Sequence, residues 1–403
     1  MSTGVSYEGY QVLRVKLANP EQIEIIEQLE MKGMVDRWLA TRTFVDIMVT
    51  KQYGEFVKSQ LQKKSLLFEV TIENVQKNID AENPPIKKEK IGRNGLNFTF
   101  ENYHNVEDVH AYIDNIAKEY PSTVEIITIG QSFEGTPLKV IRIKPEQNVT
   151  VARKIWVDGG THAREWITIS SVLYLVNELV FNRKSLEPHV KNVEFHILPL
   201  INPDGYTYSH ETNRRWRKNR NDNGDNQGLF GCVGIDLNRN WPYHWGESGS
   251  NNFQCADDYR GLKAGSEPET RAIVQYIMNE TSNFMGFISF HSYGQYILYP
   301  WGYSKDELFD QGELHRVGQA MASSIKKATT MEYTVGSAAS LLYIAPGGFY
   351  DWAKGVAKIK YSYTIELRDT GKYGFDLPAS EIVPVGKEAF AAVSTLAKEI
   401  HLS

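Results

Sequence analysis

Hydrophobic residues along the chain alternate between short runs typical of buried strands and longer repeats typical of amphipathic helices. Residues 155–157 form one such short run, a Gly-Gly turn follows, and apolar residues recur at helical spacing over residues 166–181. His162 and Glu165 lie between this predicted strand and this predicted helix. Open α/β sheets bind ligands at the carboxyl ends of their strands, which is where these two residues are predicted to lie. The segment is therefore the first candidate for a functional site.

The first 80 residues carry a pattern of their own. Strands are predicted at residues 10–17, 44–49 and 66–72, and helices at residues 19–29 and 53–61. Elements of this length and order predict a small α+β domain over residues 1–80, with helices packed on one sheet.

Residues 81–93 interrupt the pattern, because they have no periodicity and contain two prolines and several basic residues. Exposed segments of this kind are where proteolytic nicking concentrates. Two interpretations are open here, an ordinary tether between domains and an activation site.

From residue 94 to residue 403, strands and helices alternate, which predicts an α/β domain with a doubly wound sheet and helices on both faces. The predicted strands are residues 124–130, 139–143, 154–157, 193–201, 286–290 and 361–367. The predicted helices are residues 105–120, 166–181, 268–279, 312–328 and 379–401. Residues 205–260 are rich in Asn and Gly without a sustained period, which predicts a long functional loop.

The charge balance excludes one class of partner. The chain of 403 residues has a formal net charge of -5, which argues against a nucleic acid bound through its phosphates. No apolar run is as long as a membrane span. The first residues also lack the basic region and apolar core of a signal peptide.

Cysteine and sequon positions bear on the compartment. The two cysteines, Cys232 and Cys255, are compatible with a disulfide and with two free thiols. Three glycosylation sequons begin at Asn97, Asn148 and Asn279. Together these features favour a secreted protein whose signal peptide is missing from this sequence.

A metal site is suggested by residues that follow predicted strands. The His162/Glu165 pair alone is weak, because a hydrogen-bonded histidine near a solvated glutamate is the simpler interpretation. His291 directly follows residues 286–290 and completes a set of two histidines and one carboxylate, which suits catalytic Zn²⁺ with a position left for water. Glu366 follows residues 361–365, where a carboxylate can accept a proton from water and later pass it to a leaving amine.

The long loop adds a candidate anion site. Residues 213–220 are a basic run whose plain interpretation is a solvated face. Arg239 stands beside amide side chains in residues 236–241. A planar guanidinium binds a carboxylate through two parallel hydrogen bonds, so Arg239 is a candidate carboxylate clamp.

Taken together, these motifs resemble the zinc metallocarboxypeptidase family, and in particular the zymogens of its pancreatic-type A and B branch, closest to the A type. The matching segments are residues 161–166, 201–206, 214–218, 236–241, 290–293, 343–352 and 364–371. The two-His, one-Glu zinc set is that of carboxypeptidase A. The resemblance implies a mixed eight-stranded sheet preceded by a ferredoxin-like activation domain.

The resemblance also assigns the reaction. It implies one zinc ion on His162, Glu165 and His291, with Glu366 as general base and then general acid. Arg217 would stabilise the oxyanion that forms as water adds to the scissile carbonyl. The implied activity is hydrolysis of the C-terminal peptide bond of peptides and proteins.

The resemblance also implies which further residues contact the substrate and which form a disulfide. The resemblance implies that the terminal carboxylate of the substrate is held by Asn238, Arg239 and Tyr343. It implies that Arg164, Tyr293 and Phe375 line the site upstream of the scissile bond. It also implies a disulfide between Cys232 and Cys255.

The residues of the specificity pocket match the family pattern less well than the catalytic residues do. Members that prefer basic C-terminal residues carry an Asp at the position occupied here by Tyr350, whereas Asp351 matches an acidic residue common to both types. Other pocket positions are small or neutral, namely Gly302, Ala338, Ala345 and Thr364. We expect a preference for apolar or aromatic C-terminal residues, with Tyr350 narrowing the pocket.

The remaining expectations concern regulation. By resemblance, residues 1–80 are an inhibitory propeptide, residues 81–93 a linker cut after Arg93 by a trypsin-like protease, and residues 94–403 the catalytic domain of a monomeric enzyme. Two alternatives are another zinc amidohydrolase of the same scaffold and a catalytically silent peptide-binding homologue. The full set of catalytic and ligand residues argues against the silent homologue.

Overall fold

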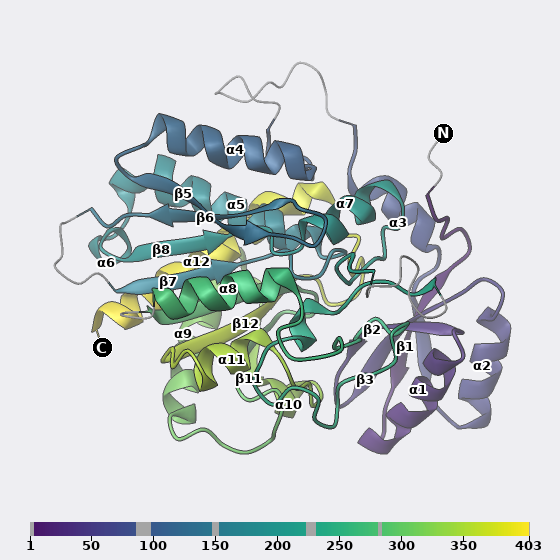
Figure 1. Ribbon diagram of the computed structural model, residues 1–403. Coiled ribbons are helices and arrows are strands. Elements are labelled where there is room, and N and C mark those ends of the chain that lie inside the picture. The colour runs from purple at the N-terminus through teal and green to yellow at the C-terminus, as the bar shows by residue number, and fades with distance from the viewer. Residues whose placement is uncertain (1–3, 86–97, 147–152, 223–230, 281–283, 403) are drawn as a thin grey trace.

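The computed structural model describes residues 4–85, 98–146, 153–222, 231–280 and 284–402 (Figure 1). Its first part is an antiparallel sheet of four strands in the order β2-β3-β1-β4. The strands are β1 (Gln11–Lys16), β2 (Val35–Ala40), β3 (Phe44–Val49) and β4 (Phe68–Ile72). The helices are α1 (Ile23–Met31), α2 (Gly54–Lys63) and α3 (Val75–Glu82).

The two faces of this small sheet have different partners, because successive side chains of a strand point to opposite sides. Leu13 and Val15 of β1 pack with Ile26 of α1 in one apolar cluster. Val12 of the same strand belongs to a second cluster with Trp38. That second cluster contains aromatic residues from the larger part of the chain, so this face of the sheet is the docking face (Figure 1).

The larger part is built on a mixed sheet of eight strands in the order β11-β10-β12-β9-β7-β8-β6-β5. The strands are β5 (Val124–Gln131), β6 (Pro137–Ile143), β7 (Lys154–Asp158), β8 (Glu194–Leu198), β9 (Phe284–Ser292), β10 (Tyr296–Tyr299), β11 (Thr334–Ser337) and β12 (Tyr361–Leu367). The central strands β8, β7, β9 and β12 are parallel, so their carboxyl ends meet at one edge.

Helices cover both faces of this sheet. One core cluster joins the sheet to α4 (Val106–Glu119), α5 (Trp166–Phe181), α9 (Gln311–Thr329) and α12 (Ile382–Leu402). The cluster on the opposite face contains α8 (Pro268–Asn279) and α11 (Phe349–Gly355). Shorter helices are α6 (Pro188–Lys191), α7 (Pro203–Glu211) and α10 (Ala338–Leu341). The predicted α/β class, with a mixed eight-stranded sheet behind a small α+β unit, is thus confirmed.

Among the described elements, three strands (β2, β10 and β11) and five helices (α3, α6, α7, α10 and α11) were not predicted. β10 and β11 have four residues each, too few to show a period. In β2 the partly exposed Asp36 and Arg37 stand next to each other, so the strand does not alternate. The expectation that the loop begins at residue 205 is wrong, because α7 continues to Glu211. Asn202 followed by Pro203 was a usable start signal, since Asn202 caps the helix by accepting a hydrogen bond from the Gly205 N–H.

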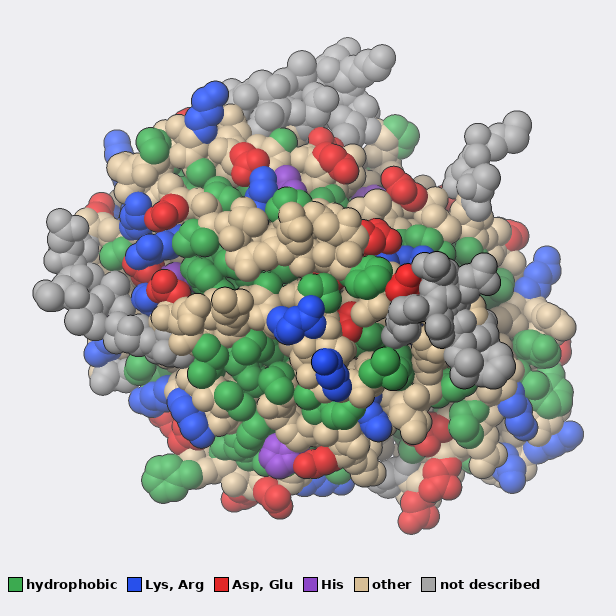
Figure 2. Space-filling view, viewed as in Figure 1, with side chains coloured by type: hydrophobic (Ala, Val, Ile, Leu, Met, Phe, Trp, Pro, Cys, Tyr) green, Lys and Arg blue, Asp and Glu red, His purple; other side chains and the backbone are tan. Residues whose placement is uncertain are grey.

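The surface carries both signs of charge. Figure 2 shows lysine and arginine side chains interspersed with acidic ones over the visible face. None of the described helices is long and apolar enough to span a bilayer. The predicted cleavage site Arg93 and the sequons at Asn97 and Asn148 lie outside the described residues.

Candidate functional site

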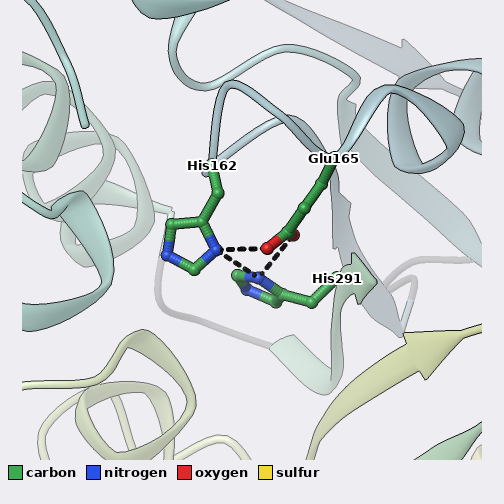
Figure 3. A group of neighbouring side chains, drawn as sticks. All are labelled: His162, Glu165 and His291. Atoms are coloured by element: carbon green, nitrogen blue, oxygen red, sulfur yellow. Dashed lines mark hydrogen bonds and ion pairs between the residues drawn. The ribbon is translucent and has the colours of Figure 1, made fainter. Parts of the chain in front are cut away.

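Three buried side chains converge at the carboxyl edge of the large sheet (Figure 3). His162 and Glu165 come from the segment between β7 and α5, and His291 lies near the end of β9. His162 Nδ1 lies 2.7 Å from Glu165 Oε1, and His291 Nδ1 lies 3.1 Å from both His162 Nδ1 and Glu165 Oε2. One ligand atom from each residue falls within 4.8 Å of the others. Two imidazole nitrogens and a carboxylate in this arrangement fit Zn²⁺.

The far side of each imidazole is also held. His162 Nε2 lies 3.0 Å from Oδ1 of Asp236, which is fully buried. His291 Nε2 lies 3.3 Å from Ser289 Oγ, and that hydroxyl donates to Asp158 Oδ1 over 2.6 Å. Partners of this kind fix the tautomer and the orientation of a metal-binding histidine.

The electrostatic environment favours ionised carboxylates at these positions. Burial alone would raise the pKa of Glu165, but His162 and His291 together lower it below its ordinary value. Burial likewise opposes the charge of Asp236, yet Arg217 and His162 hold the pKa of that carboxyl well below its usual range. Both groups are therefore ready to act as anions at neutral pH.

Glu366 lies beside the three ligands. It stands in β12 opposite His291 in the strand register, and its side chain lines the same cavity. Burial raises the pKa of Glu366 to about 8, with His291 opposing that shift and Glu165 adding to it. A cation in front of Glu366 would lower this pKa, because positive charge favours the carboxylate form.

Basic and polar side chains from the loop close the other side of the cavity. Arg217 donates from Nε and Nη2 to Asp236 Oδ2 over 3.1 and 2.8 Å, and its Nη1 lies 4.0 Å from Glu165 Oε1. Arg239 Nη2 lies 3.1 Å from the Tyr343 hydroxyl. The predicted clamp residues Asn238, Arg239 and Tyr343 all line the cavity together with the metal-binding group.

The predicted specificity pocket is shaped by Tyr350. Its hydroxyl lies 1.7 Å from where a Cβ on Gly302 would stand, so only glycine fits at that position. Asp351 is turned away from the cavity, since its carboxylate accepts hydrogen bonds from the backbone N–H of Gly302 and Tyr303 over 3.0 Å. Ala338, Ala345 and Thr364 line the cavity as expected.

The four-stranded N-terminal sheet contributes part of the wall of this cavity. Trp38, Leu39 and Ala40 line it together with the metal-binding group. The predicted upstream residues meet the same segment, because Tyr293 and Phe375 pack against Trp38. Arg164 Nη1 lies 3.4 Å from Asp36 Oδ2 and 3.0 Å from Asp257 Oδ2.

The loop that carries these side chains is held by a disulfide. Cys232 and Cys255 are bonded, with their Cα atoms 5.0 Å apart. The free-thiol alternative is therefore excluded. The bond joins two stretches of the long loop on either side of Asp236 and Arg239.

Several positioning residues were not singled out from sequence. Asp236 stood inside a recognised motif, and Asp158 ends the β7 strand directly before the Gly-Gly turn. A carboxylate at a strand end was the available signal for Asp158. The contact of Asp36 with Arg164 and the contact of Trp38 with the cavity had no sequence signal, because they depend on how two separate units dock.

Comparison with known proteins agrees with this geometry. A zinc carboxypeptidase family model matches residues 109–392, and a carboxypeptidase activation peptide model matches residues 13–82. Carboxypeptidase B of Astacus astacus is 40% identical over 73% of this chain and 96% of its own length. Carboxypeptidase A2 of Mus musculus is 35% identical over 98% of this chain and 95% of its own length.

Solved structures give the same result for the whole chain. The crystal structure of thrombin activatable fibrinolysis inhibitor covers 98% of this chain and 99% of its own, with a TM-score of 0.87 and 32% identity. Carboxypeptidase A from Helicoverpa armigera covers 98% of both chains, with a TM-score of 0.87 and 28% identity.

Proposed function

Because this chain belongs to the zinc carboxypeptidase family and carries its activation peptide, we propose that it is a secreted zymogen whose enzyme removes apolar or aromatic C-terminal residues. One observation carries the catalytic part of the proposal. The group His162, Glu165 and His291 faces the same cavity as Glu366 and two arginines. A metal-binding group, a carboxylate and fixed cations in one cavity are what peptide hydrolysis requires.

The catalytic roles follow from position. His162, Glu165 and His291 would hold one Zn²⁺, which supplies Lewis acidity for the scissile carbonyl and for water. Glu366 accepts the proton of the attacking water and passes it to the leaving nitrogen. Arg217, oriented by Asp236, directs its guanidinium at the oxygen that becomes negatively charged.

Recognition of the chain end rests on a second group of residues. Arg239 presents a guanidinium beside the Tyr343 hydroxyl, and Asn238 lies next to it in the same turn. Together they bind the terminal carboxylate of the substrate. A deacylase of the same scaffold has no need of such a clamp, which favours an exopeptidase.

The substrate preference rests on the charge and shape of the pocket. The acidic residues among the described cavity lining are Glu165 and Glu366, both beside the metal-binding group. Asp351 is engaged by backbone N–H groups, and Tyr350 occupies the pocket position that would otherwise define a basic preference. The pocket therefore lacks an anion for a C-terminal Lys or Arg.

Latency is proposed to follow the domain plan expected from the sequence. Residues 1–80 inhibit by covering the cavity, residues 81–93 form the linker, and cleavage after Arg93 by a trypsin-like protease releases residues 94–403 as a monomeric enzyme. The support is that Trp38, Leu39 and Ala40 line the cavity that contains the metal-binding group.

The test uses two blocked dipeptides, one ending in Phe and one in Lys, incubated with the chain before and after trypsin treatment. We expect chelator-sensitive release of Phe, only after trypsin, with little release of Lys. Comparable release of Lys would overturn the pocket argument and keep the mechanism. Equal activity before trypsin would overturn the zymogen part, and no release with zinc bound would indicate a silent homologue.

A further inference from the structure

Trp38 of the activation peptide fills an aromatic recess beside the catalytic cavity. Its ring centroid lies 5.1 Å from that of Phe375 and 6.5 Å from that of Tyr293. The Arg215 guanidinium carbon lies 4.7 Å from the same ring centroid. We call Arg215, Tyr293, Gly374 and Phe375 the upstream wall.

The backbone of the upstream wall leaves room for a planar ring. Gly374 has φ +61°, a conformation that favours glycine. A Cβ there would lie 2.8 Å from Trp38 Cζ3 and 3.3 Å from Tyr293 Cε1, so any side chain would displace the ring. The recess therefore depends on Gly374 having no side chain, as well as on the packing of Trp38.

Arg215 is held in place from the enzyme side and covered from the activation-peptide side. Its guanidinium forms an ion pair with Asp376, which is fully buried. The rings over it, Trp38 at 4.7 Å and Tyr7 at 5.8 Å, both belong to the activation peptide. Loss of the activation peptide therefore uncovers a cationic face whose orientation Asp376 maintains.

We propose that Arg215 is a specificity-determining residue that makes the upstream wall a subsite for an aromatic side chain upstream of the scissile bond. The inference rests on the proposed function, because it takes the cavity beside Arg217 and Arg239 as the place where the chain end is cut. Trp38 lines that same cavity, so a substrate extending outward from it passes the upstream wall. A ring stacked on Arg215 gains a cation–π contact that an alanine side chain lacks.

The competing explanation is that the Arg215–Trp38 contact only holds the activation peptide in place. The two explanations differ in substrate selectivity after cleavage. A contact that serves latency alone leaves the trypsin-activated enzyme indifferent to the residues upstream of the cut. A subsite gives that enzyme a preference for an aromatic residue at one upstream position.

The experiment uses blocked tetrapeptides that all end in Phe. The reference has alanine at the three upstream positions, and each of three further peptides has Trp at one of them. The full chain is activated with trypsin, and kcat/KM is measured for each peptide. We expect one Trp peptide to exceed the reference by about fivefold, the size of one exposed cation–π contact.

The variants separate stacking from folding. Arg215→Leu combined with Asp376→Leu removes both charges and so leaves no unpaired buried carboxylate. Arg215→Lys keeps the charge without the planar face. Arg220→Leu is the matched control, because Arg220 lies in the same loop as Arg215 and stacks on Tyr208 of α7 and on Trp216, at 3.7 and 4.6 Å from the ring centroids.

In support of the subsite, the double variant loses the Trp preference through a higher KM for the Trp peptide, and Arg215→Lys weakens that preference. Arg220→Leu retains the preference. The inference is overturned if the parent cleaves all four peptides equally or if the double variant keeps the Trp preference. Failure of the parent to cleave the reference at all would overturn the proposed function and this inference with it.

Discussion

The metal corner consists of His162, Glu165, His291 and the supporting Asp236. It differs from the adjacent upstream wall in which part of the chain supplies the facing groups. In the metal corner, the partners of each charged group come from the enzyme itself, and the pKa values of Glu165 and Asp236 are lowered. At the upstream wall, the facing groups belong to the activation peptide. The groups of the metal corner are therefore held by residues that stay with the enzyme. The groups of the upstream wall are covered by residues of the activation peptide, which a single cleavage removes.

The carboxylates show the same contrast. Burial raises the pKa of Asp36 to about 6 although Arg164 opposes the shift, and burial raises the pKa of Glu82 to about 7 although Arg214 opposes it. Both carboxylates belong to the activation peptide, and the burial of Glu82 and the partial burial of Asp36 against the enzyme carry a desolvation cost. Its attachment therefore depends more on aromatic packing such as that of Trp38 than on ion pairs.

The largest effect is expected in the metal corner, from Glu366→Gln. Glutamine has the same shape but cannot accept the proton of the attacking water, so kcat/KM should fall by about 10³-fold. The measurement is release of Phe from a blocked dipeptide after trypsin treatment. Zinc content should equal that of the parent, because Glu366 is not one of the three ligands. Activity within tenfold of the parent at full zinc content would assign the base role elsewhere.

Asp236→Asn tests whether the hydrogen bond between Asp236 and His162 contributes to zinc affinity in the metal corner. The variant keeps an oxygen near His162 Nε2 but loses the charge that faces both His162 and Arg217. We expect zinc affinity to fall by about 10- to 100-fold, measured by competition with a chelator. Ser289→Ala, which removes a neutral partner of His291, is the control and should lose less. An unchanged zinc affinity for Asp236→Asn would show that Asp236 orients Arg217 and does not support zinc binding.

The three ligands of the metal corner were predicted from the sequence, whereas the docking of Trp38 at the upstream wall was not. His162, Glu165 and His291 were predicted to meet because each follows a strand of a sheet whose parallel order could be inferred, and the structure brings them together. The disulfide was open on spacing alone and is now established. Trp38 gave no signal, because its partners lie in a domain that folds around a different core. Local periodicity predicts elements, but docking of one unit on another depends on complementary surfaces.

Trp38→Ala tests the upstream wall from the activation-peptide side. The variant loses the contacts with Phe375 and Arg215, each about 1 kcal/mol, so the uncut chain should gain activity by about 30-fold. The measurement is the ratio of activity before and after trypsin treatment. Trp38→Phe keeps a ring in the recess and should retain more latency. A thermal unfolding scan checks that the activation peptide remains folded, and unchanged latency in a folded Trp38→Ala chain would contradict the role of the wall.

The smallest effect is a pH dependence of activation-peptide release. Asp36 has a raised pKa in the docked state, so its contribution to docking is full below its ordinary pKa of about 4 and is lost as pH rises through about 6. Release of the cleaved activation peptide, followed as appearance of activity after a trypsin pulse, should thus be faster at pH 7 than at pH 5. Asp36→Asn cannot ionise and should reduce that difference, although its amide oxygen can still accept from Trp38 Nε1. A difference that persists in Asp36→Asn would come from the other carboxylates of the activation peptide whose pKa values burial raises, Glu30 and Glu82.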